Sequence, residues 1–118
     1  MTDRQFVLNF DRRPMLERAL QYDTDNPQVY RQLVVYAFQM LHAKRTRGSI
    51  DLLFQRLRWY TTVETQSEDD FKLNDQYRAY YARKLMAEYP ELAGFFELRS
   101  SQFDQLFPAL QPGTRGTA

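Results

Sequence analysis

The chain has 118 residues, of which 43% are hydrophobic, 26% charged and 15% aromatic, and its net charge is +1. This length allows one domain with a core and excludes two. The near-neutral charge argues against binding of nucleic acid by overall charge, the lack of cysteine excludes disulfides and thiolate metal sites, and no apolar run approaches the roughly 20 residues of a membrane span. We therefore expect a cytoplasmic protein that does not enter a membrane.

The N-terminal residues predict a short strand and a first helix. Residues 5–10 alternate partly between apolar and polar side chains, which is typical of a strand. Pro14 suits the first turn of a helix. Apolar residues at helical spacing continue to about Tyr22, and the polar residues 23–26 predict a break after it.

A second, longer helix is predicted to begin at Asn26 and Pro27. Asn26 offers a side-chain cap, and Pro27 stands where no backbone N–H needs a partner. The helix is expected to run to about Ala43, with a wide apolar stripe that predicts a central place in the core. The stripe consists of Val29, Leu33, Tyr36, Ala37, Met40 and Leu41. A basic loop follows at residues 44–48.

The next stretch predicts a short helix and a β-hairpin. Ser49 is positioned to cap a helix. Its apolar face comprises Ile50, Leu53, Phe54 and Leu57. Residues 59–63 are rich in strand formers, residues 66–70 indicate an acidic turn, and residues 71–73 indicate the return strand. Two helices followed by a hairpin match the order of a winged helix-turn-helix. The predicted fold is therefore mainly α, a winged-helix-like single domain with one small β-hairpin.

The C-terminal part predicts one long helix and a short one. Asn74 is a cap for a helix over residues 75–89, which Pro90 ends. Gly94 breaks the chain again, and Ser101 is a cap for a last short helix.

We predict a single domain over residues 1–110 and a disordered tail over residues 111–118, which holds no large apolar residue. The aromatic side chains Trp59 and Phe71 are placed at the base of the hairpin. The rest of the predicted core is Val29, Leu33, Ala37, Met40, Leu41, Ile50, Leu53, Phe54, Leu57, Leu85 and Met86.

A basic cluster around the second helix of the motif is the main functional signal. Five cations stand against Asp51 alone over residues 44–58, which gives a local charge of +4 (five minus one). In a winged-helix arrangement Lys44, Arg45 and Arg47 would contact phosphates. Gln55, Arg56 and Arg58 would lie near base edges in the major groove, where Arg reads guanine and Gln reads adenine. An ordinary solvated helix face explains the same composition equally well.

Acidic residues in the predicted hairpin oppose DNA binding. Glu64, Glu68, Asp69 and Asp70 would meet phosphates with repulsion. Basic and acidic patches side by side suit a protein partner with complementary patches. We therefore name Glu68, Asp69, Asp70 and Tyr80 as candidate partner-binding residues. The alternative is that the acidic residues simply keep a hairpin turn soluble.

Several tyrosines lie on the helix predicted over residues 75–89. Tyr77 and Tyr81 fit the core. Because Tyr80 and Tyr81 are adjacent and cannot face the same direction, one of them is expected to be partly exposed, where it would stack on a base or anchor a partner.

No residue pattern favours catalysis or a cofactor. His42 is the only histidine and lacks a second ligand at metal-binding spacing. The four glycines do not form a phosphate-binding loop, and no serine stands in a nucleophile elbow. The sequence predicts a protein that is not an enzyme and needs no cofactor.

Five stretches of this chain, within residues 35–99, form a pattern. They are the run from Ser49-Ile50-Asp51 through Leu57-Arg58-Trp59, then Thr62-Val63-Glu64-Thr65, Phe71-Lys72-Leu73-Asn74, Tyr80-Tyr81-Ala82-Arg83 and Gly94-Phe95-Phe96-Glu97-Leu98-Arg99. They resemble a group of small uncharacterised bacterial and phage proteins, which carry an "RW…T" helix end followed by "FKIN", "YYAR" and "GFF" segments. The resemblance implies a phage or mobile-element context and no activity. The acidic residues 68–70, and Leu73 in place of isoleucine, depart from the pattern.

Three hypotheses follow from these observations. The first is a non-catalytic module that binds double-stranded DNA. The alternative is a protein-interaction module, such as a small phage-encoded inhibitor of a host system. The third is a structural or homo-oligomeric protein that uses the apolar C-terminal segment as an exchange or dimer surface. This segment comprises Phe95, Phe96, Phe103, Leu106 and Phe107.

Overall fold

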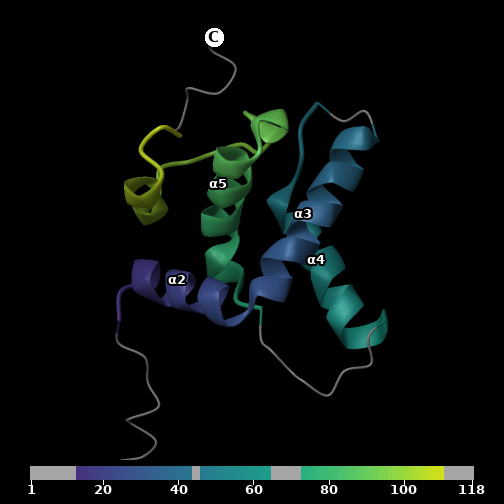
Figure 1. Ribbon diagram of the computed structural model, residues 1–118, viewed down its shortest axis with the longest axis horizontal. Helices are drawn as coiled ribbons and strands as arrows, with labels where there is room; N and C mark the ends of the chain where they lie inside the picture. The colour runs from purple at the N-terminus through teal and green to yellow at the C-terminus, as the bar shows by residue number, and fades with distance from the viewer. Residues whose placement is uncertain (1–12, 44–45, 65–72, 111–118) are drawn as a thin grey trace, which may run out of the picture.

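The computed structural model describes residues 13–43, 46–64 and 73–110. These residues form α2 (Met15–Asp25), α3 (Pro27–His42), α4 (Ile50–Trp59), η1 (Tyr60–Glu64), η2 (Asp75–Tyr77), α5 (Arg78–Glu88), η3 (Pro90–Leu92) and η4 (Gln102–Leu106). α5 stands beside α3, α2 runs crosswise at the lower end of α5, and α4 packs against both α3 and α5 (Figure 1). The predicted mainly α character is confirmed. The strand over residues 5–10 and the tail over residues 111–118 lie outside the described residues.

The predicted break between α2 and α3 is wrong for residues 23–25, which continue α2. The polar side chains that led to the prediction of a turn form hydrogen bonds within the helix instead. The Thr24 hydroxyl donates to the Leu20 carbonyl at 3.0 Å, and the Gln21 amide donates to Asp25 at 2.8 Å. Asn26 ends α2 instead of capping α3, because its side-chain amide donates to the Tyr22 carbonyl at 3.0 Å.

The prediction of the first hairpin strand is wrong, because α4 continues into a π-helical turn, η1, over Tyr60–Glu64. The hydroxyl of Thr61 donates to the Arg58 carbonyl at 3.1 Å. Thr61, a residue that favours strands, is thus held in the helical turn by a hydrogen bond to its own backbone neighbourhood. The described residues contain no strand. The turn at residues 66–70 and most of the return strand lie outside them. The Ser49 cap is confirmed, since its hydroxyl accepts the Leu52 N–H at 3.2 Å.

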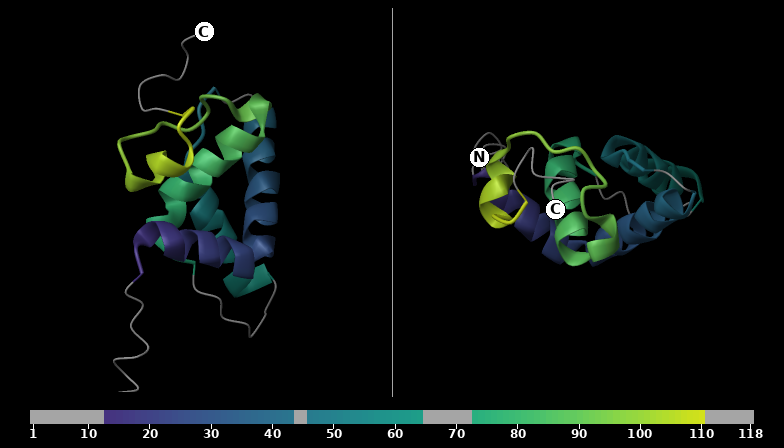
Figure 2. Two further views of the ribbon diagram at one scale, coloured as in Figure 1. Left: turned by 60° about the vertical axis from the view of Figure 1, so that its left-hand side comes forward. Right: turned by 90° about the horizontal axis from the view of Figure 1, so that it is seen from above.

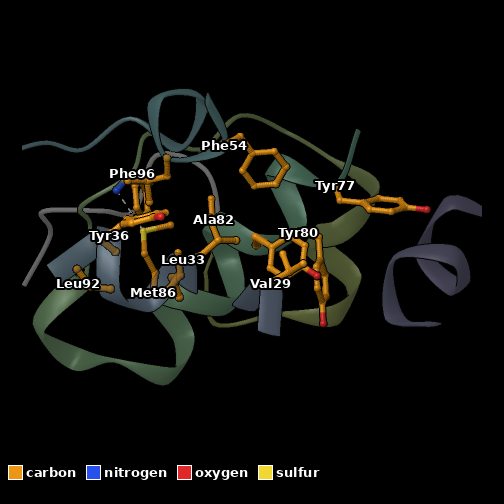
Figure 3. Packing of buried hydrophobic residues seen from close by; sticks show 14 of the residues in the cluster. Val29, Leu33, Tyr36, Phe54, Tyr77, Tyr80, Ala82, Met86, Leu92 and Phe96 are labelled. Carbon is orange, nitrogen blue, oxygen red and sulfur yellow. Dashed lines mark hydrogen bonds between the residues drawn. The ribbon is translucent and has the colours of Figure 1, made fainter. Parts of the chain in front are cut away.

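The core forms where α3, α4 and α5 meet and extends under the C-terminal segment (Figure 3). Of the predicted core, eight side chains are buried: Val29, Leu33, Ala37, Leu53, Phe54, Leu57, Leu85 and Met86. Met40, Leu41 and Ile50 are partly buried against them. Trp59 was placed wrongly, because 58% of it is exposed. Phe71 lies outside the described residues.

The C-terminal segment is part of this core. Phe95, Phe96 and Phe103 are buried, and Leu106 and Phe107 pack against the cluster. Of the five residues predicted to form the exchange or dimer surface, three are therefore buried in the folded chain and two are partly buried. Gly94 adopts φ 69°, a left-handed conformation that suits glycine, where the chain leaves η3. The predicted Ser101 cap is confirmed as a capping box with Asp104. None of the described helices is long and apolar enough to cross a membrane.

Candidate functional site

The outward side of α4 and η1 carries an exposed apolar line, which we call the α4 stripe. It consists of Leu52, Trp59 and Val63, which are 48%, 58% and 44% exposed. Spacings of seven and four residues keep side chains on one side of a helix. The buried side chains of α4 face the opposite way into the core. Figures 1 and 2 place α3 and α4 at the far end of the molecule from η4.

Two of the predicted DNA-reading residues lie beside the α4 stripe. Gln55 is exposed between Leu52 and Trp59 along the helix. The Arg56 guanidinium lies 4.9 Å from the centre of the Tyr36 ring, so a cation–π contact holds it toward α3. Arg47 is exposed in the loop before α4.

The third predicted reading residue, Arg58, turns the other way. Its guanidinium pairs with Asp75 and donates to the Leu73 carbonyl at 3.4 Å. Asp51 pairs with Arg78 at 3.3 Å along the same side of α4. The local +4 charge is therefore reduced by Asp75, which lies outside residues 44–58 in sequence. Of the remaining candidates, Lys44, Arg45, Glu68, Asp69 and Asp70 lie outside the described residues.

Tyr80 lies in a buried polar cluster that joins α2 to α5. Only 3% of Tyr80 is exposed, and its hydroxyl donates to the Asp23 carboxylate at 2.6 Å. The Lys84 ammonium pairs with the same carboxylate and lies 4.1 Å from the centre of the Tyr30 ring. The Tyr30 hydroxyl donates to Glu88 at 2.8 Å. Burial, followed by the bond to Asp23, raises the pKa of Tyr80, so its hydroxyl stays protonated as a donor.

Both Tyr80 and its neighbour Tyr81 are buried, so the expectation that one of them is partly exposed is wrong. α5 is covered on several sides. Tyr80 packs against Phe103 and Phe107, with ring centres 5.8 and 5.9 Å away. Tyr81 packs against Phe54 of α4 at 6.0 Å. Core positions for Tyr77 and Tyr81 are confirmed, and Tyr77 points toward α2 (Figure 3).

The two adjacent tyrosines give a matched pair of substitutions. Tyr80→Phe removes a bond to a carboxylate, and we expect it to lower the free energy of unfolding by about 1.5 kcal/mol. The Tyr81 hydroxyl is buried and has no hydrogen-bond partner among the described residues. Tyr81→Phe is therefore expected to leave stability unchanged or to raise it slightly. Urea unfolding followed by circular dichroism measures both, and equal losses would contradict the assignment.

Arg83 is buried, with 1% exposed, although nothing in the sequence distinguishes it from a surface arginine. Its Nε donates to Asp104 at 2.8 Å, and its two terminal nitrogens donate to the carbonyls of Ala79 at 3.0 Å and Arg99 at 2.6 Å. Burial raises the pKa of Asp104, but the Ser101 N–H and the Arg83 guanidinium outweigh it and hold the pKa below its usual range. Arg83 thus fastens the C-terminal segment to α5.

The described residues contain no group of three or more His, Cys, Asp or Glu side chains that would hold a metal ion. The polar clusters around Asp23 and Arg83 have their charged groups paired with each other. A comparison of the chain with protein families, curated proteins and solved structures finds no match. Among the described residues, the α4 stripe, with Gln55 and Arg56 beside it, is a surface feature that the packing of the domain does not explain.

The α4 stripe was not predicted from the sequence. Neither the exposure of Leu52 and Val63 nor the outward position of Trp59 was predicted. The signal that would have revealed them is helical phase. Because Leu53 and Leu57 face the core, a helix continued past residue 58 places Trp59 on the opposite side.

Proposed function

We propose that this chain is a non-catalytic binding module that holds a partner protein on the α4 stripe. The supporting observation is the exposure of Leu52, Trp59 and Val63 in one line. Single exposed apolar residues are ordinary on protein surfaces, whereas an aligned group is typical of an interaction site. Trp59 is the only tryptophan of the chain, and tryptophan is the residue most enriched among those that dominate binding energy.

The dimensions of the stripe favour a helical partner. Leu52 and Val63 are eleven positions apart, which corresponds to about 16 Å along a helix. Helices pack through residues spaced three, four and seven apart, as these are. An amphipathic helix of about three turns would cover all three side chains.

The charges beside the stripe favour an acidic partner. Arg56 borders it, and Arg47 is exposed in the preceding loop. Asp51 is engaged by Arg78, so its charge is already balanced. A second copy of the chain would bring like charges together, whereas acidic side chains on a partner helix would complement Arg47. In a phage or mobile-element context the partner would be a host protein, and the chain its inhibitor.

DNA binding is the second candidate, favoured by the exposure of Gln55 and Arg56 on one side of α4. Three observations make it the weaker one. α3 and α4 are separated by residues 43–49, which is longer than the roughly three- to four-residue turn of a helix-turn-helix. The first wing strand is replaced by η1, and Arg58 is paired with Asp75.

The α4 stripe is tested by affinity capture with the native chain and two variants. Trp59→Ser is expected to weaken a stripe-dependent partner by about 30-fold or more, because truncation of a central tryptophan costs about 2 kcal/mol or more. Val35→Ser is the matched control, since Val35 is 47% exposed on α3 and lies outside the stripe. A captured protein supports the proposal only if its affinity, measured with the purified protein, falls with Trp59→Ser and not with Val35→Ser.

A titration with mixed-sequence duplex DNA at two salt concentrations separates the second candidate from the first. Binding that weakens steeply with salt, and that is lost in a Gln55→Ala, Arg56→Ala double variant but kept in Trp59→Ser, would replace the protein-binding proposal with DNA binding. Equal capture of every partner by the native chain and by Trp59→Ser would also overturn it.

A further inference from the structure

A groove of about 700 Å³ lies on another part of the surface, between the start of α4, the first half of α5 and the segment 96–101. This volume falls in the range of ligand and peptide sites. Ala79, Ala82 and Phe96 give it an apolar lining, and Ser49 and Ser100 contribute polar groups. None of these residues belongs to the α4 stripe.

One wall of the groove is a segment held firmly at both ends. At its start the Phe95 carbonyl accepts the Gly48 N–H at 2.9 Å, and the Phe96 N–H contacts the Met86 sulfur at 3.4 Å. At its end Arg83 donates to the Arg99 carbonyl, and the Ser101 N–H donates to Asp104 at 3.0 Å. The chain between runs from η3 to η4 without coiling (Figure 1). Its position is thus fixed before any partner binds, which lowers the cost of binding.

The middle of this segment has free backbone groups. Within the described residues, the amide and carbonyl groups of Leu98 and Ser100 make no backbone hydrogen bond. In extended chain, neighbouring residues turn these groups to opposite sides. Because Arg99 turns its carbonyl to Arg83 on α5, the groups of Leu98 and Ser100 are turned away from α5, to the outer edge of the segment, where another chain can pair with them.

The side chains along the segment carry opposite charges two residues apart. Glu97 and Arg99 are both exposed, and neither forms an ion pair within the described residues. Residues two apart lie on one side of an extended chain and face the corresponding side chains of a paired strand. A complementary strand would place a cation opposite Glu97 and an anion opposite Arg99.

We propose that the outer edge of this segment, at the rim of the groove, binds an extended peptide segment of another protein, which pairs with the backbone at Leu98 and Ser100 and carries one acidic and one basic residue two positions apart. Strand addition of this kind takes its affinity from main-chain bonds and its specificity from alternate side chains. This edge is independent of the α4 stripe, so either proposal stands if the other fails.

Two capped synthetic peptides test this edge, each with valines alternating with one glutamate and one lysine, in the two opposite charge orders. Titration into the full chain, followed by amide NMR shifts, should show binding with shifts at residues 97–101. The native chain is expected to prefer one charge order by about three- to tenfold, because cross-strand ion pairs are modest.

A double variant, Glu97→Arg with Arg99→Glu, is the decisive comparison. Both side chains are exposed, so the fold is kept, and the preference between the two peptides should invert. N-methylation of the preferred peptide at its central amides should abolish binding. The proposal is overturned if neither peptide shifts residues 97–101, if the double variant keeps the native preference, or if the N-methylated peptide binds equally well. Trp59→Ser serves as the control and should bind the peptides as the native chain does.

Discussion

Replacing Arg83 with methionine is expected to lower the free energy of unfolding by about 3 kcal/mol or more. Removing one partner of a buried ion pair typically costs about 3–5 kcal/mol, since the other partner is left uncompensated. Asp104 retains 20% side-chain exposure, which favours the lower end of that range. Two carbonyls, of Ala79 and Arg99, also lose their donors. Urea unfolding followed by circular dichroism gives the change in free energy.

Arg83→Lys separates the charge from the shape of the guanidinium. Lysine keeps the charge but lacks the planar fork that reaches Asp104 and the two carbonyls together, so an intermediate loss is expected. Arg99→Ala is the matched control, because the structure uses only the backbone carbonyl of Arg99 in this cluster. A loss for Arg83→Met no larger than for Arg99→Ala would contradict the role of Arg83.

The same cluster gives a pH dependence with a defined sign. The pKa of Asp104 is lowered in the folded chain, so its ionised form contributes stability above the unfolded value near 4. That contribution is lost as pH falls from there through the folded pKa. Arg83→Met should lose less stability over that acidic range than the native chain.

Gly48→Ala is expected to lower the free energy of unfolding by up to about 3 kcal/mol, at the upper end of ordinary overpacking. A Cβ at position 48 would lie 2.3 Å from Cε2 and 2.7 Å from Cδ2 of Phe95. The Phe95 ring cannot move aside easily, because it is buried and packs against Phe96 with ring centres 5.2 Å apart. Thermal and urea unfolding would measure the loss.

A second substitution tests whether the contact with Phe95 causes the loss of stability in Gly48→Ala. Phe95→Leu removes ring atoms that the new Cβ would meet, so the cost of Gly48→Ala should be smaller in that background. Such coupling between touching residues is measured by a double-mutant cycle. Additive losses would show that the loop at Gly48 is sensitive for a reason other than contact with Phe95.

The helices were predictable from local signals, and their ends were less so. Ser49, Asn74 and Ser101 are caps because each side chain bonds a nearby backbone N–H. The residues after Trp59 were predicted as a strand from their β-branched and aromatic composition. Strand propensity depends on packing partners more than on the residue itself, and here α4 continues through them.

The polar clusters were not predictable, because their members are far apart in sequence. Arg83 meets Asp104 across 21 positions, and Asp23 meets Tyr80 and Lys84 across 57 and 61. Nothing around Arg83 or Lys84 distinguishes them from the surface cations of a helix. The candidate DNA-reading residues were predicted as a group from the order of the elements and the local charge, and the structure separates Arg58 from Gln55 and Arg56 by giving it a partner in Asp75.

The position of the single tryptophan also decides what intrinsic fluorescence reports on this chain. Indole emission responds to the water around the ring, and Trp59 is already largely in water in the folded state. Its emission will change little when the core opens, so a fluorescence melt would understate unfolding. The same ring becomes a sensitive reporter when another molecule covers α4, and a blue shift on mixing would mark that event without any added label.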